Sequence, residues 1–192
     1  MPADEPIALL DLATGAFAER LAAIGPDQWG QASTCAGWTV RDLVGHVLGG
    51  NAMAVALLDG ASADEAMAYL AGLPVEDDAV AQFAANAAAQ LDAFRSDGAA
   101  ERVCHHPMGD MPGAQVAGFR IGDLTLHTWD LARSIGADES LPPDLVERVW
   151  ADLSPMAEMI SSIGLFGEGP SGTVADGAPL QQRLLDLAGR RP

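Results

Sequence analysis

The chain has 192 residues, and 49% of them are hydrophobic, so it is long enough and apolar enough to bury a substantial core. Its formal net charge at pH 7 is −17, and its ten basic residues are all arginine. This charge argues against a basic surface for nucleic acid and against electrostatic attraction to anionic lipid. We therefore expect a protein that binds neither nucleic acid nor membranes.

The sequence also favours a reducing compartment. No stretch approaches the roughly 20 consecutive apolar residues of a transmembrane helix. The acidic N-terminal segment lacks the positive start of a secretory signal. Cys35 and Cys104 are far apart and form no CxxC motif. We expect a cytoplasmic protein with a single domain over 1–192, monomeric or homodimeric, whose two cysteines are free, buried and chemically inert.

Helical signals dominate the first third of the chain. Apolar residues at three- and four-residue spacing predict a first helix that ends near Gly25 and Pro26. Thr39 and Asp42 have the spacing of a capping box, in which each side chain bonds the other's backbone N–H. A second helix should therefore begin after Thr39, and we expect it to run to Leu58.

The rest of the chain is also expected to be mainly helical, and glycine and proline residues mark the boundaries of its helices. In the helix that we expect over about 76–96, the side chains that should face the core are those of Val80, Phe83, Ala84, Ala87, Leu91 and Phe94. After residue 60 we expect a short helix over 62–71, a longer one over about 76–96, and a loop over 97–113 with a short extended pair. A helix over about 114–135 should follow and end at Gly136, and the next helix should start at Pro142 and Pro143. The last expected elements are a loop over 164–179 and a short helix from Leu180 to Leu187. Together they predict an all-α fold, an up-and-down four-helix bundle with additional short helices.

Three side chains on two of these helices are candidate metal ligands. His46 lies at the edge of the apolar stripe of the second helix, and Asp123 and His127 lie one turn apart on the helix over 114–135. Histidine nitrogen and carboxylate oxygen bind zinc and related divalent metals, and three protein ligands leave a position open for water or substrate. The spacing alone more often reflects an Asp–His hydrogen bond or salt link on the helix surface, and a single histidine such as His46 is more often a core or boundary residue with an ordinary partner than a ligand.

Two further polar residues share this helix face. Asp130 is placed to accept a hydrogen bond from His127 and orient it, or to bond a neighbouring helix. Arg120, one turn before Asp123, is placed to hold an anionic substrate or to neutralise that carboxylate. No nucleophile–base triad is evident in the sequence, so we assign no side chain as the nucleophile.

Other histidines and tryptophans have simpler interpretations. His105 and His106 are adjacent and lie in a loop, so we expect surface residues and not a metal-binding pair. Trp38 and Trp129 we expect in the core.

Three stretches of the sequence resemble one protein family. They are GWTVRDLVGHVLGGN (37–51), LHTWDLARSIG (126–136) and the tail PLQQRLLDLAGRRP (179–192). They resemble the mycothiol-dependent maleylpyruvate isomerase-like proteins of actinobacteria, and most of all their short, single-domain subfamily. The resemblance implies a maleylpyruvate isomerase N-terminal-like domain, that is, a DinB-like metal-binding helical bundle.

The resemblance also implies a chemistry. His46, Asp123 and His127 would hold a divalent metal, with zinc as our first expectation and nickel or another ion as alternatives. Mycothiol would be the cosubstrate of a transferase or isomerase that acts on a small electrophilic molecule. The nucleophile would be a metal-bound thiolate or water.

Two departures from the family pattern modify these expectations. The isomerase typically has glutamate where this chain has Asp123, which is one methylene shorter, so we expect altered metal affinity or geometry. The isomerase also carries a C-terminal domain that helps to form its active site. We expect no such domain in this chain, and therefore a substrate other than maleylpyruvate. Two alternatives remain: a non-catalytic metal-binding bundle, and a natural-product biosynthesis protein that uses the bundle cavity for a different reaction.

Overall fold

The structure is a computed structural model that describes residues 5–158 and 169–192. The chain divides into two compact units, Met1–Ser140 and Leu141–Pro192, which we describe separately. The single domain expected over 1–192 stays a prediction. No helix among the described residues is both long and apolar enough to cross a membrane.

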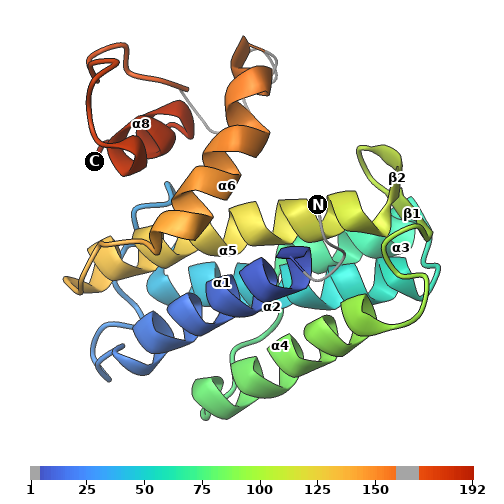
Figure 1. Ribbon diagram of the computed structural model, residues 1–192. Coiled ribbons are helices and arrows are strands. Elements are labelled where there is room, and N and C mark those ends of the chain that lie inside the picture. Colours follow the sequence, from blue (N-terminus) through green and yellow to red (C-terminus); the bar gives the residue numbers. More distant parts are fainter. Residues whose placement is uncertain (1–4, 159–168) are drawn as a thin grey trace. The chain divides into compact units, whose positions relative to one another are not determined.

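Four long helices form a bundle in the first unit (Figure 1). They are α1 (Glu5–Ala22), α2 (Val40–Leu58), α4 (Ala79–Arg95) and α5 (Gly113–Ile135). Helix α1 packs against α4 and α5, and α2 packs against the same two helices, so the order around the bundle is α1, α5, α2, α4. The expected all-α four-helix bundle is confirmed.

Each helix turns an apolar stripe towards the bundle interior. Phe17 of α1 and Phe83 of α4 meet there with ring centroids 5.1 Å apart. The inward row of α4 differs from the expected one, because Val80 is 48% exposed and Ala84 is also exposed. The helix begins at Ala79, and that residue starts the buried row. Val80 is about 100° further round the helix and points to solvent.

The start of α2 is as the sequence predicts. The Thr39 side chain accepts a hydrogen bond from the Asp42 backbone, and the Asp42 carboxylate accepts one from the backbone N–H of Thr39. After α2 the chain returns along this helix through α3 (Ala63–Met67) and η1 (Ala68–Ala71). The return is close because Gly45 has no side chain, so its carbonyl accepts from the N–H of Leu73 at 2.9 Å. Helix α4 therefore begins beside the first half of α2.

A short hairpin joins α4 to α5. Strands β1 (Val103–His106) and β2 (Gly109–Pro112) pair antiparallel, which confirms the expected extended pair. Helix α5 ends at Gly136, whose φ of 71° is left-handed and suits glycine.

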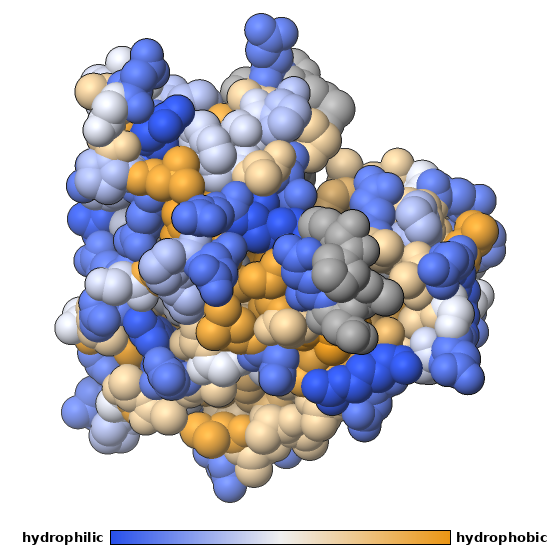
Figure 2. Space-filling view, viewed as in Figure 1, coloured by the Kyte–Doolittle hydropathy of each residue, from blue (hydrophilic) through white to orange (hydrophobic). Residues whose placement is uncertain are grey.

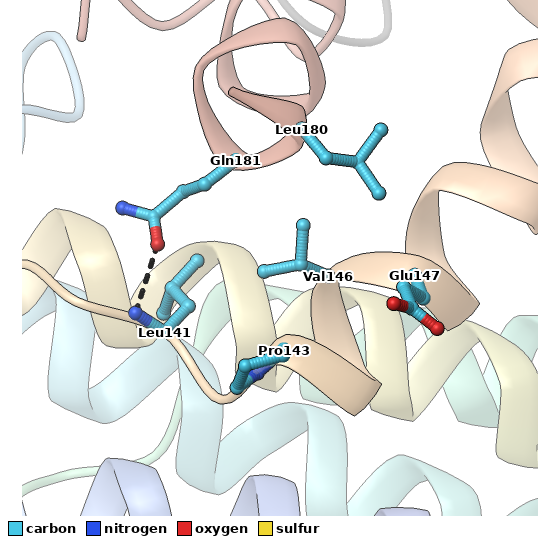
Figure 3. Close-up of a pocket in the computed structure, with 6 residues that line it drawn as sticks. All are labelled: Leu141, Pro143, Val146, Glu147, Leu180 and Gln181. Atoms are coloured by element: carbon cyan, nitrogen blue, oxygen red, sulfur yellow. Dashed lines mark hydrogen bonds between the residues drawn. The ribbon is translucent and has the colours of Figure 1, made fainter.

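The second unit contains α6 (Pro143–Leu153), η2 (Ser154–Met156) and α8 (Leu180–Leu187). The Arg183 guanidinium lies 4.5 Å from the ring centroid of Trp150, which links α8 to α6. A small pocket opens between these helices, and its lining residues are Leu141, Pro143, Val146, Glu147, Leu180 and Gln181 (Figure 3). Residues 164–168 of the expected loop lie outside the described residues.

On the face shown in Figure 2, hydrophilic and hydrophobic residues are interspersed. The large apolar side chains that are more than a third exposed are Leu12, Met67, Leu70, Val80, Val103 and Met108 among the described residues. Single apolar residues on a surface are usual and require no binding partner.

Candidate metal centre

The three expected ligands come together between α2 and α5. Nε2 of His46 and Nε2 of His127 each lie 3.4 Å from Oδ1 of Asp123. The side chains of His46 and Asp123 are 20% and 26% exposed, and that of His127 is 10% exposed. The trio is therefore largely enclosed by protein but still partly accessible to solvent.

The spacing of these atoms suits a cation better than direct hydrogen bonds. A hydrogen bond to a carboxylate is usually shorter than about 3.2 Å. Ligand atoms held at about 2.1 Å from a tetrahedral ion lie about 3.4 Å apart. Both Asp123–histidine separations are 3.4 Å. The residues present thus fit a divalent cation with two imidazole ligands and one carboxylate ligand.

Asp130 holds the ring of His127 in the orientation that such a cation needs. Nδ1 of His127 lies 2.9 Å from Oδ2 of Asp130, which is buried, and Oδ1 of Asp130 accepts from Oγ1 of Thr34 at 3.1 Å. A neutral imidazole has one N–H and one lone pair. With the N–H donated from Nδ1 to Asp130, the lone pair of Nε2 faces Asp123 and His46.

Arg120 occupies the other oxygen of Asp123. Its Nη1 donates to Oδ2 of Asp123 at 2.6 Å, its Nη2 to Oδ1 of Asn51 at 2.7 Å, and its Nε to Oε1 of Gln90 at 3.1 Å. Arg120, Asn51 and Gln90 are all buried. Of the two roles considered for Arg120, this geometry supports neutralisation of Asp123 and leaves Oδ1 directed at the two histidines.

Aromatic packing positions His46. Its ring centroid lies 4.8 Å from that of Trp38, while Nδ1 of His46 is buried and has no hydrogen-bond partner among the described residues. Trp38 is half-buried and also lies 6.2 Å from the His127 ring, so it borders the site and our core interpretation of it was wrong. Trp129 is 2% exposed, as expected for the core.

The charges of the trio are strongly coupled. Burial alone would raise the pKa of Asp123, but the neighbouring Arg120 and His127 outweigh it and hold that pKa well below its usual range. Burial alone would lower the pKa of His127, but Asp123 and the hydrogen bonds of this ring raise that pKa well above its usual value. A cation that binds here must therefore displace a proton from His127.

Cys35 lies beside the site, which the sequence did not indicate. Both cysteines are free, and Cys104 is buried, but Cys35 is only half-buried. Its Sγ lies 3.5 Å from Oδ2 of Asp130 and 3.9 Å from Nδ1 of His127. The expectation that Cys35 is buried was wrong, and the expectation that it is chemically inert stays a prediction. The cysteine and the aspartate contact the same ring nitrogen, whereas a Cys–His–Asp triad needs one contact at each nitrogen.

His105 and His106 lie away from the trio, on β1. His105 pairs with Asp110 across the hairpin at 2.8 Å, and Nδ1 of His106 accepts from the N–H of Met108 at 3.1 Å. Neither belongs to a possible metal-binding group among the described residues.

Comparisons with known proteins agree with this architecture. Residues 10–132 match the family model described as the mycothiol maleylpyruvate isomerase N-terminal domain. Two uncharacterised proteins, from two strains of Mycobacterium tuberculosis, are each 34% identical over 153 residues, which are 77% of this chain and 77% of theirs.

Two crystal structures share the fold. One, of the mycothiol-dependent maleylpyruvate isomerase, has a TM-score of 0.64 at 20% identity and covers 80% of this chain and 70% of its own. The other is the structure of a histidine-to-alanine mutant of the mycothiol-dependent maleylpyruvate isomerase. It has a TM-score of 0.66 at 21% identity, and the match covers 88% of this chain and 74% of the mutant isomerase chain. From the family match and the 34% identical relatives, this chain belongs to the family of the mycothiol maleylpyruvate isomerase N-terminal domain.

Proposed function

We propose that this protein is a thiol-dependent isomerase or transferase that uses a divalent cation at the His46–Asp123–His127 site. Mycothiol is the proposed thiol, and a small electrophilic molecule is the proposed substrate. One observation carries the proposal: in a chain of this family, the imidazole nitrogens of His46 and His127, on two facing helices, each lie 3.4 Å from Oδ1 of Asp123. Such an enzyme would act in the cytoplasm, as a monomer or homodimer.

The donor set narrows the choice of cation. Two imidazoles and one carboxylate suit zinc, nickel and similar first-row divalent ions. Zinc is our first choice, because three protein ligands with one open position is its usual catalytic arrangement. The shorter Asp123 is compatible with this site, since its Oδ1 already lies 3.4 Å from both imidazole nitrogens.

A divalent cation held there would lower the pKa of a coordinated thiol and so supply a thiolate near neutral pH. Residues of the protein hold the proposed ligands in the orientation that such a cation requires. Asp130 keeps the proton of His127 on Nδ1, and Arg120 keeps the second oxygen of Asp123 occupied. Trp38 packs against His46 and shields one side of its ring from water. No side chain need act as the nucleophile.

The net charge of the chain supports the choice of thiol. Mycothiol is close to neutral, whereas glutathione is a net anion. The field of a protein with a formal charge of −17 repels anions at low salt. We therefore expect a preference for mycothiol over glutathione that diminishes as salt is added.

Metal content provides the first test. Protein purified without an affinity tag should contain close to one divalent ion per chain. His46→Ala and His127→Ala should each lose most of it while the far-UV circular dichroism of the helices is retained. Full retention of metal in either variant would falsify the ligand assignment.

Thiol consumption provides the second test. Metal-loaded protein should consume mycothiol in the presence of activated alkenes or haloarenes, and His127→Ala should slow this reaction. Metal-loaded protein that consumes no thiol with any electrophile would instead support the non-catalytic bundle. Protein that binds no metal even after reconstitution would support a different use of the bundle cavity.

A further inference from the structure

A second group of ligand-type atoms lies at the opposite nitrogen of the His127 ring. Sγ of Cys35 is 3.9 Å from Nδ1 of His127 and 3.5 Å from Oδ2 of Asp130, and those two atoms are 2.9 Å apart. In the part of the chain that the structure describes, two groups of three side chains are close enough to hold a metal ion, and this is the second. The two groups share His127.

We propose that Cys35, His127 and Asp130 form a second cation site, specific for thiophilic divalent ions such as Cd²⁺. We further propose that an ion there excludes an ion from the His46–Asp123–His127 site. The exclusion rests on the proposed function, because it requires His46, Asp123 and His127 to bind metal. The existence of the Cys35 site does not depend on the proposed function.

The donor atoms determine which ions this site selects. A thiolate sulfur is a soft ligand, and it favours soft cations over the harder ones that oxygen ligands favour. Tetrahedral zinc, with bonds of about 2.3 Å to sulfur and about 2.1 Å to nitrogen or oxygen, places ligand atoms about 3.4 to 3.6 Å apart, and the larger Cd²⁺ places them slightly further apart. The observed separations of 3.9, 3.5 and 2.9 Å lie around these values. The shortest is the hydrogen bond from His127 to Asp130, which opens when its proton leaves.

The surrounding loop holds Cys35 in place. The backbone N–H of Thr34 donates to Oγ of Ser134 at 3.0 Å, and Nε2 of Gln31 donates to the Ser134 carbonyl at 2.8 Å. Both bonds tie the loop to the last turn of α5. Cys35 is half-buried, whereas Asp130 is 1% and His127 8% exposed, so Cys35 is the most exposed residue of the three.

The exclusion follows from the proton of one imidazole. When Cd²⁺ binds at Nδ1 of His127, the Cys35 thiol proton and the proton on Nδ1 are released to solvent, and the neutral ring carries its one hydrogen on Nε2. A neutral imidazole has one lone pair, so Nε2 then carries hydrogen and cannot bind a second ion. That hydrogen faces Oδ1 of Asp123, which is 3.4 Å away.

Cadmium alone tests the Cys35 site. Addition of Cd²⁺ to the full-length protein should produce the ultraviolet charge-transfer band of a cadmium–thiolate bond. Cys35→Ser should lose this band, whereas His46→Ala should keep it, because His46 belongs only to the first trio. Cys104→Ser is the matched control and should also keep the band. If the band is absent from the native protein, or survives in Cys35→Ser, the proposed site is wrong.

Displacement tests the exclusion. Protein loaded with Zn²⁺ should release one zinc for each cadmium that generates the thiolate band. Protein that holds both ions at once would overturn the exclusion, since His127 would then bridge them. If the native protein binds no zinc, the exclusion fails together with the proposed function. The thiolate band still decides the Cys35 site in that case, so the two failures remain distinguishable.

Discussion

Gly50→Ala tests the network behind the proposed metal site without altering any proposed ligand. Gly50 lies on α2, directly against the guanidinium of Arg120, and a Cβ there would overlap Nη1 of that side chain. The helix backbone on one side and the bonds of Arg120 to Asn51 and Gln90 on the other leave little room. We expect the added methyl group to displace the guanidinium from Asp123.

The cost follows from the bonds that move. Nη1 and Nη2 of Arg120 donate to Asp123 and Asn51 at 2.6 and 2.7 Å. A buried hydrogen bond that involves a charged group contributes about 1.5 to 3 kcal/mol to stability, so the loss of both costs about 3 to 6 kcal/mol. Alanine is preferred over glycine in a helix by about 1 kcal/mol. The net expectation is a loss of about 2 to 5 kcal/mol in the free energy of unfolding.

Urea denaturation measures this loss, and Gly15→Ala is the matched control. Gly15 also lies in a helix, α1, but a Cβ there meets no atom within 4 Å. This control should be stabilised by about 0.5 to 1 kcal/mol.

A second measurement distinguishes a disturbed Arg120 network from a general loss of packing. Gly50→Ala should lower metal affinity about 10- to 100-fold, the usual effect of disturbing a group that orients a ligand.

The reasoning would be refuted if Gly50→Ala were as stable as Gly15→Ala. Arg120 would then have another position of equal energy, and the fixed orientation of Asp123 would need a different cause. A destabilised variant with unchanged metal affinity would refute only the link between Arg120 and the metal centre.

Three further predictions concern the metal and the proton. Asp123→Asn should lower metal affinity by at least about tenfold, because the loss of a ligand weakens binding at least as much as the loss of a group that orients one. Asp123→Glu should preserve binding. If Asp123→Asn bound metal as tightly as the native protein, Asp123 would not be a ligand. Replacement of both His105 and His106 should leave metal content unchanged, and a loss of metal in that variant would move the site to the hairpin. In metal-free protein, the raised pKa of His127 stabilises the fold fully below its ordinary value of 6.5 and decreasingly as pH rises through the folded value. Stability should therefore fall by about 1.4 kcal/mol per pH unit in that window, and His127→Gln should lack this slope in urea titrations.

Local interactions explain what the sequence predicted well. The capping box at Thr39 and the left-handed Gly136 each depend on residues within one turn of a helix end, so their spacing suffices to place those ends. Asp123 and His127 share a helix face for the same reason. The position of His46 at the edge of the apolar stripe made it a candidate, but no pattern within α2 says which helix lies opposite. The family resemblance supplied that pairing.

Long-range packing explains what the sequence did not reveal. Gln90 is buried because α4 packs against α2 and its amide oxygen meets Arg120 of the diagonal helix. Periodicity within α4 gives no sign of this contact, and it also misplaced Val80. Cys35 reaches Asp130 because hydrogen bonds from Thr34 and Gln31 tie its loop to the end of α5 at Ser134. Such contacts arise from the helix order around the bundle, which the return segment after α2 helps to set.

The supporting residues also determine how a bound cation would behave. Arg120 takes one oxygen of Asp123 at 2.6 Å, and Asp130 takes one nitrogen of His127 at 2.9 Å, so each ligand has a single remaining donor atom for the metal. The positive charge of Arg120 offsets the negative charge of Asp123, the carboxylate of Asp130 adds one negative charge behind His127, and histidines that ligate a metal are neutral. A divalent cation would therefore leave the proposed site with a net positive charge. That charge favours an anionic fourth ligand, and thiolate is the anion that a small-molecule thiol supplies.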